Sequence, residues 1–334
     1  MRHSMIFLLV IASFLVVVVG LLFLLITQAR LLWEPLAPQE LEALRQAVRP
    51  EPQTEMTLLG SEGILRSRWN WLAAQLFAGV LLADAKLNGR NVTLIVDSGV
   101  IIEEPILLYA RAARKVGVRL TAELPTAKLS ERGPEFSRFR GVADRLELGG
   151  LSVNSVPVRV VAGHYRLKSL GLPLYHVDGF IGISFLERFA ATWDLHRLHL
   201  VLRRSHLPQG QELAATLHKQ ELEYEGERQH FYYVEGLLDG QGPYQVLIDT
   251  GASIPLLLVS NRIAQAYGQE RFRVRRLEAG ELVLEDLPAM EIEIEKELPF
   301  LSPDIIILGT GLLKAQGIKR LTLDFLAGKL YAER

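Results

Sequence analysis

The chain of 334 residues contains no cysteine. Disulfide bonds and cysteine-ligated zinc sites are therefore excluded, while an oxidising and a reducing compartment both remain compatible with the composition. An excess of charge of one sign is also lacking, because 37 Lys and Arg stand against 38 Asp and Glu. This balance gives no indication of a nucleic-acid partner. The eight histidines show no metal-ligand spacing, so we expect no metal site.

One long apolar run is present, at the start of the chain. Residues 5–26 contain a single clearly polar side chain, Ser13. A helix of this length spans a hydrocarbon core of about 30 Å. A cleaved signal peptide is the alternative, and it fits less well because the run is long and no small-residue cleavage pattern follows it. We predict a transmembrane anchor over residues 1–27. Since no basic cluster follows it, we expect the body of the chain on the extracytoplasmic side, periplasmic or extracellular.

The segment 28–76 has the composition of a membrane-proximal stalk or linker. Residues 40–48 carry apolar side chains at helical spacing, and Pro38 suits the first turn of that helix. A second apolar stretch, residues 69–77, fits either a packed helix or a strand. We therefore predict a stalk that contains at least one short helix.

Short apolar runs separated by Gly, Asn and Asp follow, and this texture is typical of β-structure. It occupies residues 77–205 and 226–334, which we predict to be two β-lobes. The polar residues 206–225 between them contain Pro208 and Gly210 and are expected to be an inter-lobe linker, with a short helix over 211–217.

The two predicted lobes repeat one pattern. In each, a hairpin signal, Asn88-Gly89 or Asp239-Gly240, leads into an apolar strand that ends in an aspartate. The first strand ends in Asp97-Ser98-Gly99, and the second in Asp249-Thr250-Gly251-Ala252-Ser253. Two carboxyl groups brought face to face cannot both ionise, so they share a proton and can act as general base and general acid.

The repeat continues downstream, which distinguishes it from chance. Each half has an apolar pair followed by a glycine, Gly182 or Gly309, then a short helical stretch and a closing strand. Taken alone, an Asp-Ser-Gly tripeptide is an ordinary turn sequence. Self-similarity over four elements instead favours a matched pair of functional loops.

These motifs resemble those of the aspartic peptidases of the retropepsin and pepsin type. The resemblance implies a mainly β, bilobal pepsin/retropepsin-like fold with short helices, here preceded by one transmembrane helix. It implies that Asp97 and Asp249 hold a catalytic water, without a metal or organic cofactor. It further implies that one chain supplies both halves of the site and that the substrate is a protein or peptide. The residues expected to support the catalytic loops are Ser98, Gly99, Gly182, Thr250, Gly251, Ser253 and Gly309.

The first lobe is longer than the second between its aspartate and its downstream glycine. Residues 120–128 and 139–148 are expected to form a long hairpin around 131–134. This position suits a flap that closes over a substrate and excludes water. Phe136 or Phe139 would stand where pepsins have a flap tyrosine.

One departure from the family pattern lies directly after the first aspartate loop. Val100-Ile101-Ile102 occupies positions where the family usually has Ala-Ser or Ala-Thr. Two functions therefore remain open: a membrane-tethered aspartic endopeptidase, and a catalytically inactive, peptidase-like protein that binds peptides or serves as a scaffold. Pairing of like lobes between two chains is less economical, because one chain already carries both loops.

Overall fold

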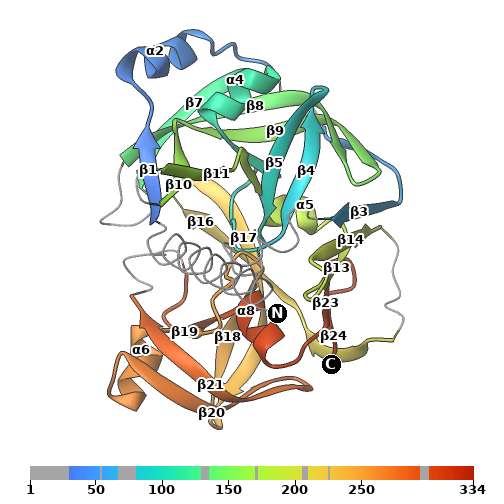
Figure 1. The fold of residues 1–334 in the computed structure, drawn as a ribbon, viewed down its shortest axis with the longest axis vertical. Coiled ribbons are helices and arrows are strands. Elements are labelled where there is room, and N and C mark those ends of the chain that lie inside the picture. The colour runs from blue at the N-terminus through green and yellow to red at the C-terminus, as the bar shows by residue number, and fades with distance from the viewer. Residues whose placement is uncertain are drawn as a thin grey trace, which may run out of the picture.

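The computed structural model describes residues 30–52, 55–66, 80–128, 135–169, 172–204, 210–224, 226–293 and 301–334. The predicted anchor, the stretch 69–77 and the tip of the predicted flap lie outside the described residues. Within the described ranges, no helix is both long and apolar enough to cross a membrane. The architecture is mainly β with short helices (Figure 1), as the sequence predicts.

The upper lobe in Figure 1 is built on an eight-stranded sheet with the order β2-β9-β6-β12-β5-β4-β8-β7, in which β8 also pairs with β9. Two short helices, α4 (Ala110–Val116) and α5 (Ile183–Leu186), follow β6 and β12. The strands of this sheet are β2 (Thr57–Leu59), β4 (Leu82–Leu87), β5 (Arg90–Val96), β6 (Ile106–Tyr109), β7 (Arg119–Lys128), β8 (Glu135–Leu148), β9 (Leu151–Val161) and β12 (Gly179–Ile181).

The lower lobe has a seven-stranded sheet with the order β16-β17-β18-β22-β19-β21-β20, in which β17 also pairs with β20. Its strands are β16 (His218–Tyr224), β17 (Glu227–Leu238), β18 (Gln241–Asp249), β19 (Leu257–Ser260), β20 (Arg271–Ala279), β21 (Leu282–Ile292) and β22 (Ile305–Gly309). Its helices are α6 (Asn261–Ala264), the 3-10 helix η1 (Gln265–Tyr267) and α8 (Thr310–Ala315).

The two lobes share their pairing pattern. In the first lobe β5 and β12 are parallel, and so are β6 and β9. The same holds in the second lobe for β18 with β22 and for β19 with β21. The predicted hairpin turns are present, with positive φ at Asn88, Gly89, Asp239 and Gly240. The internal repeat read from the sequence is thus a structural repeat.

A six-stranded sheet, at the right of Figure 1, joins the two halves. Its strands, in sheet order, are β15 (Glu212–Thr216), β24 (Lys329–Glu333), β23 (Arg320–Asp324), β13 (Ala190–Asp194), β14 (His199–Arg203) and β3 (Glu62–Arg66). The central pair, β13 and β23, comes from opposite halves, and Thr192 faces Thr322 across it. The predicted helix over 211–217 is wrong: these residues form β15, because pairing with β24 satisfies their backbone and buries Ala214.

The described residues of the predicted stalk lie against the first lobe. The helix α2 (Pro38–Gln46) begins at Pro38, as predicted, and buries Leu44. Ion pairs tie this helix to the lobe, with Arg114 Nη2 2.8 Å from a Glu40 oxygen. The strand β1 (Arg30–Pro35) pairs with β10 (Gly163–Ser169), which pairs with β11 (Leu172–His176). These residues therefore lie on the surface of the first lobe, attached by strand pairing, by Leu44 and by ion pairs.

The predicted flap hairpin is present as β7 and β8, which pair as far as Lys128 and Glu135. In the second lobe, β20 follows η1 after residues 268–270, so the described residues of that lobe have no counterpart of β7. Phe139 is fully buried in the core, so its ring does not face a cleft. Phe136 packs on Trp33 of β1, with 5.4 Å between the ring centroids.

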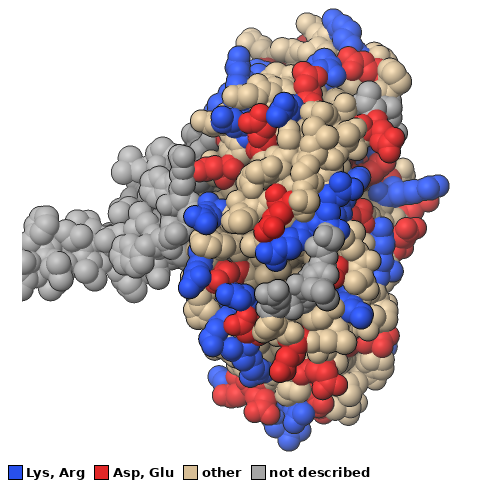
Figure 2. Space-filling model, turned by 90° about the vertical axis from the view of Figure 1, so that its right-hand side faces the viewer, with Lys and Arg blue, Asp and Glu red and all other residues tan. Residues whose placement is uncertain are grey.

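The face shown in Figure 2 carries Lys and Arg side chains interspersed with Asp and Glu. This mixture follows the charge balance of the sequence, and it gives this face no large area of one sign.

Candidate active site

Each aspartate stands where a central strand ends. Asp97 follows β5, and Asp249 is the last residue of β18. A parallel neighbour supports each strand from the same lobe, since β12 pairs with β5 and β22 with β18. A glycine stands at the end of each supporting strand, Gly182 directly after β12 and Gly309 as the last residue of β22, and neither position has room for a side chain. A Cβ at Gly182 would lie 2.8 Å from the Val100 carbonyl oxygen, and one at Gly309 would lie 2.1 Å from that of Ala252.

The hydroxyls of Ser98 and Thr250 join the two loops reciprocally. Ser98 N donates to Thr250 Oγ1 at 2.9 Å, and Thr250 N donates to Ser98 Oγ at 3.0 Å. Each hydroxyl then donates to a carbonyl of the other lobe: Ser98 Oγ to Ile248 at 2.7 Å, and Thr250 Oγ1 to Val96 at 3.4 Å. Both side chains are buried, so these bonds hold the loops together without competition from water.

The two carboxyl groups meet between the loops. A hydrogen bond joins the Asp97 and Asp249 side chains. Gly99 N donates to Asp97 Oδ1 at 2.7 Å, and Gly251 N donates to Asp249 Oδ1 at 2.8 Å. The glycines permit this approach: a Cβ at Gly251 would lie 2.2 Å from Asp97 Oδ2, and one at Gly99 would lie 2.8 Å from Asp249 Cγ.

The environment raises the pKa of both carboxyls. Burial is the largest cause for Asp97, and the negative charge of Asp249 adds to it, so the pKa of Asp97 lies well above its usual range. Burial also raises the pKa of Asp249, against hydrogen bonds from Asp97, Gly251 and Ala252. The Ala252 N–H donates to Asp249 Oδ1 at 3.0 Å. Backbone N–H groups of Gly99 and Gly251 lower the pKa of Asp97 against these effects, so each carboxyl receives two backbone donors. The two raised pKa values favour one proton shared by the pair.

The structure thus brings together all but one of the side chains predicted for the site. The exception is Ser253, whose hydroxyl has no hydrogen-bond partner among the described residues, although its backbone packs closely on Gly311 of α8. Sequence reasoning missed Ser184 of α5, whose hydroxyl donates to the Ile102 carbonyl at 2.5 Å. The sequence feature that could have indicated this residue is its position two residues after Gly182. This bond ties the segment after the Asp97 loop to the helix beneath it.

The departure at Val100-Ile101-Ile102 has a packing reason. Ile101 is 8% exposed and belongs to an apolar cluster whose other buried members come from the second lobe, among them Phe231 and Leu247. The first loop therefore has an apolar anchor in the opposite lobe where the family pattern has a small or hydroxyl side chain.

No group of three or more His, Asp and Glu side chains in the described ranges is arranged to hold a metal ion. The chemistry available at the site is that of two coupled carboxyl groups next to backbone N–H donors.

Comparison with known proteins found a family model that matches part of the first lobe. Residues 83–185 match the family model described as aspartyl protease. This match confirms the predicted resemblance to aspartic peptidases of the retropepsin and pepsin type. A search of curated proteins found no match.

Two solved structures are among those similar to this chain. A retropepsin-like aspartic protease from Rickettsia conorii is 18% identical, covers 45% of this chain and 94% of its own, and has a TM-score of 0.27. Basic 7S globulin from soybean is 10% identical, covers 82% of this chain and 96% of its own, and has a TM-score of 0.41.

Proposed function

We propose that this chain, which resembles the aspartic peptidases of the retropepsin and pepsin type, is a membrane-tethered aspartic endopeptidase. The observation that supports this most directly is the pair of coupled carboxyls of Asp97 and Asp249, joined by a hydrogen bond and held by reciprocal bonds between Ser98 and Thr250. A raised pKa keeps one carboxyl protonated beside an ionised one, which is the combination that activates a water and protonates an amide.

A difference in hydrogen bonding between the two loops supports an assignment of roles. Asp249 receives N–H donors from Gly251 and Ala252 of its own loop, and we assign it as the carboxylate that accepts a proton from the attacking water. Asp97, whose pKa is raised by burial and by the charge of Asp249, holds the proton that passes to the carbonyl oxygen of the substrate. Collapse of the resulting tetrahedral intermediate cleaves the C–N bond, and the amine leaves with a proton from the pair. The hairpin of β7 and β8 is the element placed to exclude water during these steps.

Peptide cleavage by the full-length protein in detergent micelles tests this proposal. A mixture of unstructured peptides is incubated with wild type, Asp97→Asn and Asp249→Asn between about pH 3 and pH 8, and products are read by mass spectrometry. Each substitution is expected to lower the rate at least 100-fold, within the range typical of general acid–base groups. Activity that survives either substitution contradicts the shared-carboxyl mechanism. Peptide binding without cleavage by wild type would instead establish the inactive, peptide-binding alternative.

The anchor and its orientation are part of the same proposal. Residues 5–26 support a single transmembrane helix, with the two lobes on the extracytoplasmic side. Membrane fractionation of wild type and of a chain lacking residues 1–27 tests the tether. Accessibility of the lobes to an added protease in intact cells and in inverted vesicles tests the side. Lobes digested only in inverted vesicles would contradict the orientation.

A further inference from the structure

The hairpin of β16 and β17 extends beyond the sheet of its own lobe. β17 pairs with β18 from Tyr233 opposite Leu247 onward, whereas residues 227–232 pair, among the described strands, with β16 alone. Extending this register places Phe231 opposite Asp249 and Glu227 about 13 Å further along the strand. The hairpin therefore passes the carboxyl pair and reaches the first lobe, between the two lobes in Figure 1.

Phe231 connects the hairpin with both aspartate loops. Its side chain is fully buried in the apolar cluster that contains Ile101, and Ala252 packs against the same cluster. Ile101 is the one first-lobe member of that cluster among the described residues. The cluster around this ring therefore includes a residue next to each aspartate loop.

Glu227, at the tip of the hairpin, is buried in the first lobe among three arginines. Arg140 and Arg159 stand opposite each other on β8 and β9, an arrangement that is unfavourable for like charges without counterions. Glu227 Oε2 lies 3.0 Å from Arg159 Nη1 and 3.4 Å from Arg138 Nη1. Arg159 is 1% exposed, so its charge depends on these partners.

The other buried counterion belongs to the segment that follows the Asp97 loop. Glu104 Oε1 lies 2.8 Å from Arg140 Nε, and Glu104 Oε2 lies 2.5 Å from Arg159 Nη2. Glu104 and Glu227 thus share Arg140 and Arg159, which links the tip of the hairpin to the segment 100–105. That segment is also held by α5, because Gly182 N donates to the Pro105 carbonyl at 3.1 Å.

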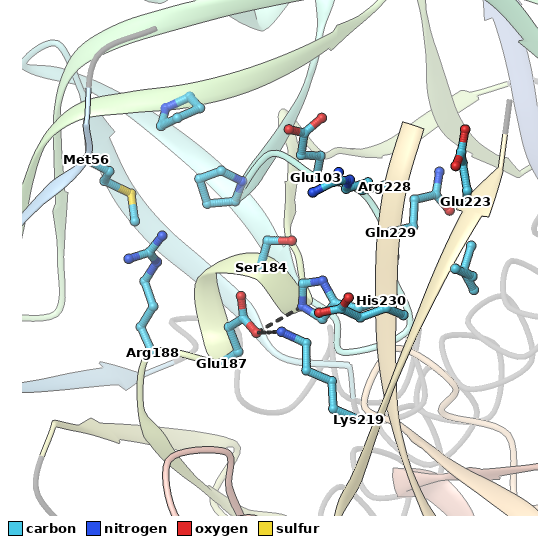
Figure 3. A pocket seen from close by; sticks show the side chains of 14 residues that line it. Met56, Glu103, Ser184, Glu187, Arg188, Lys219, Glu223, Arg228, Gln229 and His230 are labelled. Atoms are coloured by element: carbon cyan, nitrogen blue, oxygen red, sulfur yellow. Dashed lines mark hydrogen bonds and ion pairs between the residues drawn. The ribbon is translucent and has the colours of Figure 1, made fainter. Parts of the chain in front are cut away.

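The face of the hairpin makes a third contact, shown in Figure 3. Lys219 Nζ and His230 Nε2 each lie 3.0 Å from Glu187 Oε2, next to α5. The Tyr232 hydroxyl donates to the same oxygen at 3.0 Å. Beside these contacts lies a cavity of about 580 Å³, lined by residues of the hairpin and of the first lobe, Glu103 and Ser184 included. The hairpin therefore meets the first lobe at separate points, each carried by a few side chains.

We propose that Glu227 and Phe231 are positioning residues for the carboxyl pair: through them, the hairpin of β16 and β17 sets the Asp97 loop against the second lobe. This inference rests on the proposed function, because it concerns the alignment of the two aspartates. Neither side chain is assigned a contact with substrate. Their effect passes through Ile101 and through the arginines that hold Glu104.

Full-length Glu227→Gln and Phe231→Leu in detergent micelles test the inference. The matched controls are Glu235→Gln, an exposed carboxylate on the same strand, and Phe272→Leu, a buried ring on β20. For the two test variants we expect kcat to fall about 10- to 100-fold with KM within about twofold, since small misplacements of reacting groups cost rate. The acidic and basic limits of the pH–rate profile are expected to move closer together as the carboxyls separate. The controls are expected to stay within about twofold of wild type.

A second measurement needs no activity. The effect of Asp97→Asn on thermal unfolding at neutral pH is compared in the wild-type and Phe231→Leu backgrounds, as a double-mutant cycle. If Phe231 positions the loop, the effect shrinks in the Phe231→Leu background. The inference is overturned if the test variants lose as much stability as Phe272→Leu but keep the kcat and the pH–rate profile of wild type, and if Asp97→Asn changes the thermal stability of Phe231→Leu as much as that of wild type. If wild type cleaves no peptide, the proposed function fails, and the double-mutant cycle alone tests whether Phe231 positions the Asp97 loop. If Glu227→Gln does not fold, the inference is tested with Phe231→Leu alone.

Discussion

In the second lobe, the N–H that follows the Asp-Thr-Gly turn points at the aspartate side chain: Ala252 N donates to Asp249 Oδ1 at 3.0 Å. At the equivalent place in the first lobe, Val100 N donates at 3.3 Å to the backbone carbonyl of Asp97. Asp97 consequently has one donor fewer from its own loop. Asp97 instead receives an N–H from Gly251, across the pair. Two loops with nearly the same sequence therefore hold their carboxyls with different sets of donors.

Substitution of the two loop glycines is expected to give the largest difference in activity between the loops. A Cβ at Gly251 would lie 2.2 Å from Asp97 Oδ2, whereas a Cβ at Gly99 would lie 2.8 Å from the nearest atom of Asp249. We expect Gly251→Ala to lower kcat/KM at least 100-fold and Gly99→Ala about 10-fold, because displaced carboxyls lose their alignment. Initial rates with one peptide measure both. Equal losses, or a larger loss for Gly99→Ala, would show that the close approach is not asymmetric.

The buried hydroxyls that join the loops come next. Ser98→Ala removes the hydroxyl that donates to the Ile248 carbonyl and accepts from Thr250 N, and unpaired buried groups cost about 1–3 kcal/mol each. We expect a loss of about 3 kcal/mol in the free energy of unfolding. Thr250→Ala is expected to cost about 2 kcal/mol, because its bond to Val96 is long at 3.4 Å. Urea unfolding measures these losses.

Thr250→Ser is the control for this pair, since it keeps the hydroxyl and removes one methyl group. It is expected to stay within about 1 kcal/mol of wild type, close to the value of one buried methylene. A Thr250→Ser protein as unstable as Thr250→Ala would assign the effect to packing rather than to the hydrogen bonds.

The sequence predicted those features that depend on local chemistry. Turns at Asn88-Gly89 and Asp239-Gly240 are encoded by residues that tolerate positive φ, and the repeat around Asp97 and Asp249 supplied the topology. The helix expected over 211–217 failed because the partner of that strand, β24, lies far along the chain. Local propensity does not register such a partner.

The role of Ile101 was hidden for a related reason. A single sequence shows an apolar residue after the Asp97 loop, but not the cluster of second-lobe side chains, Phe231 included, in which it is buried. The arginines facing each other on β8 and β9 were equally invisible, because their register is set by the turn at Gly149-Gly150 and one of their two buried counterions, Glu227, comes from the other lobe. Contacts between lobes, in general, required the structure.

Substituting one aspartate at a time compares the protonation of the two carboxyls through the stability of the protein, without any assay of activity. The pKa of Asp97 in the folded protein lies above its unfolded value, so folding binds a proton more tightly, and stability falls as the pH rises through the folded pKa. At pH 7, Asp97→Asn removes this cost and is expected to raise the free energy of unfolding.

At pH 3, below the ordinary pKa of an aspartate, the gain is expected to disappear. Asp249→Asn should gain less at pH 7, because it also weakens the bonds from Gly251 and Ala252 to a full carboxylate. Thermal melts at both pH values measure this. A gain independent of pH, or a larger one for Asp249→Asn, would reverse the assignment of the shared proton.

The smallest effect is expected where the two halves come closest to symmetry, at Thr192 and Thr322 of the six-stranded sheet. Their hydroxyl oxygens lie 2.7 Å apart, and Thr322 Oγ1 donates its only proton to Gln211 Oε1 at 2.6 Å. Thr192 must therefore be the donor between the threonines. Thr322→Val leaves Thr192 Oγ1 and Gln211 Oε1 without their hydrogen-bond partner and is expected to lower the free energy of unfolding by about 1 kcal/mol. Thr192→Val leaves the bond to Gln211 intact and is expected to cost about 0.5 kcal/mol. A larger loss for Thr192→Val in urea unfolding would show that the proton runs the other way across the centre of the sheet.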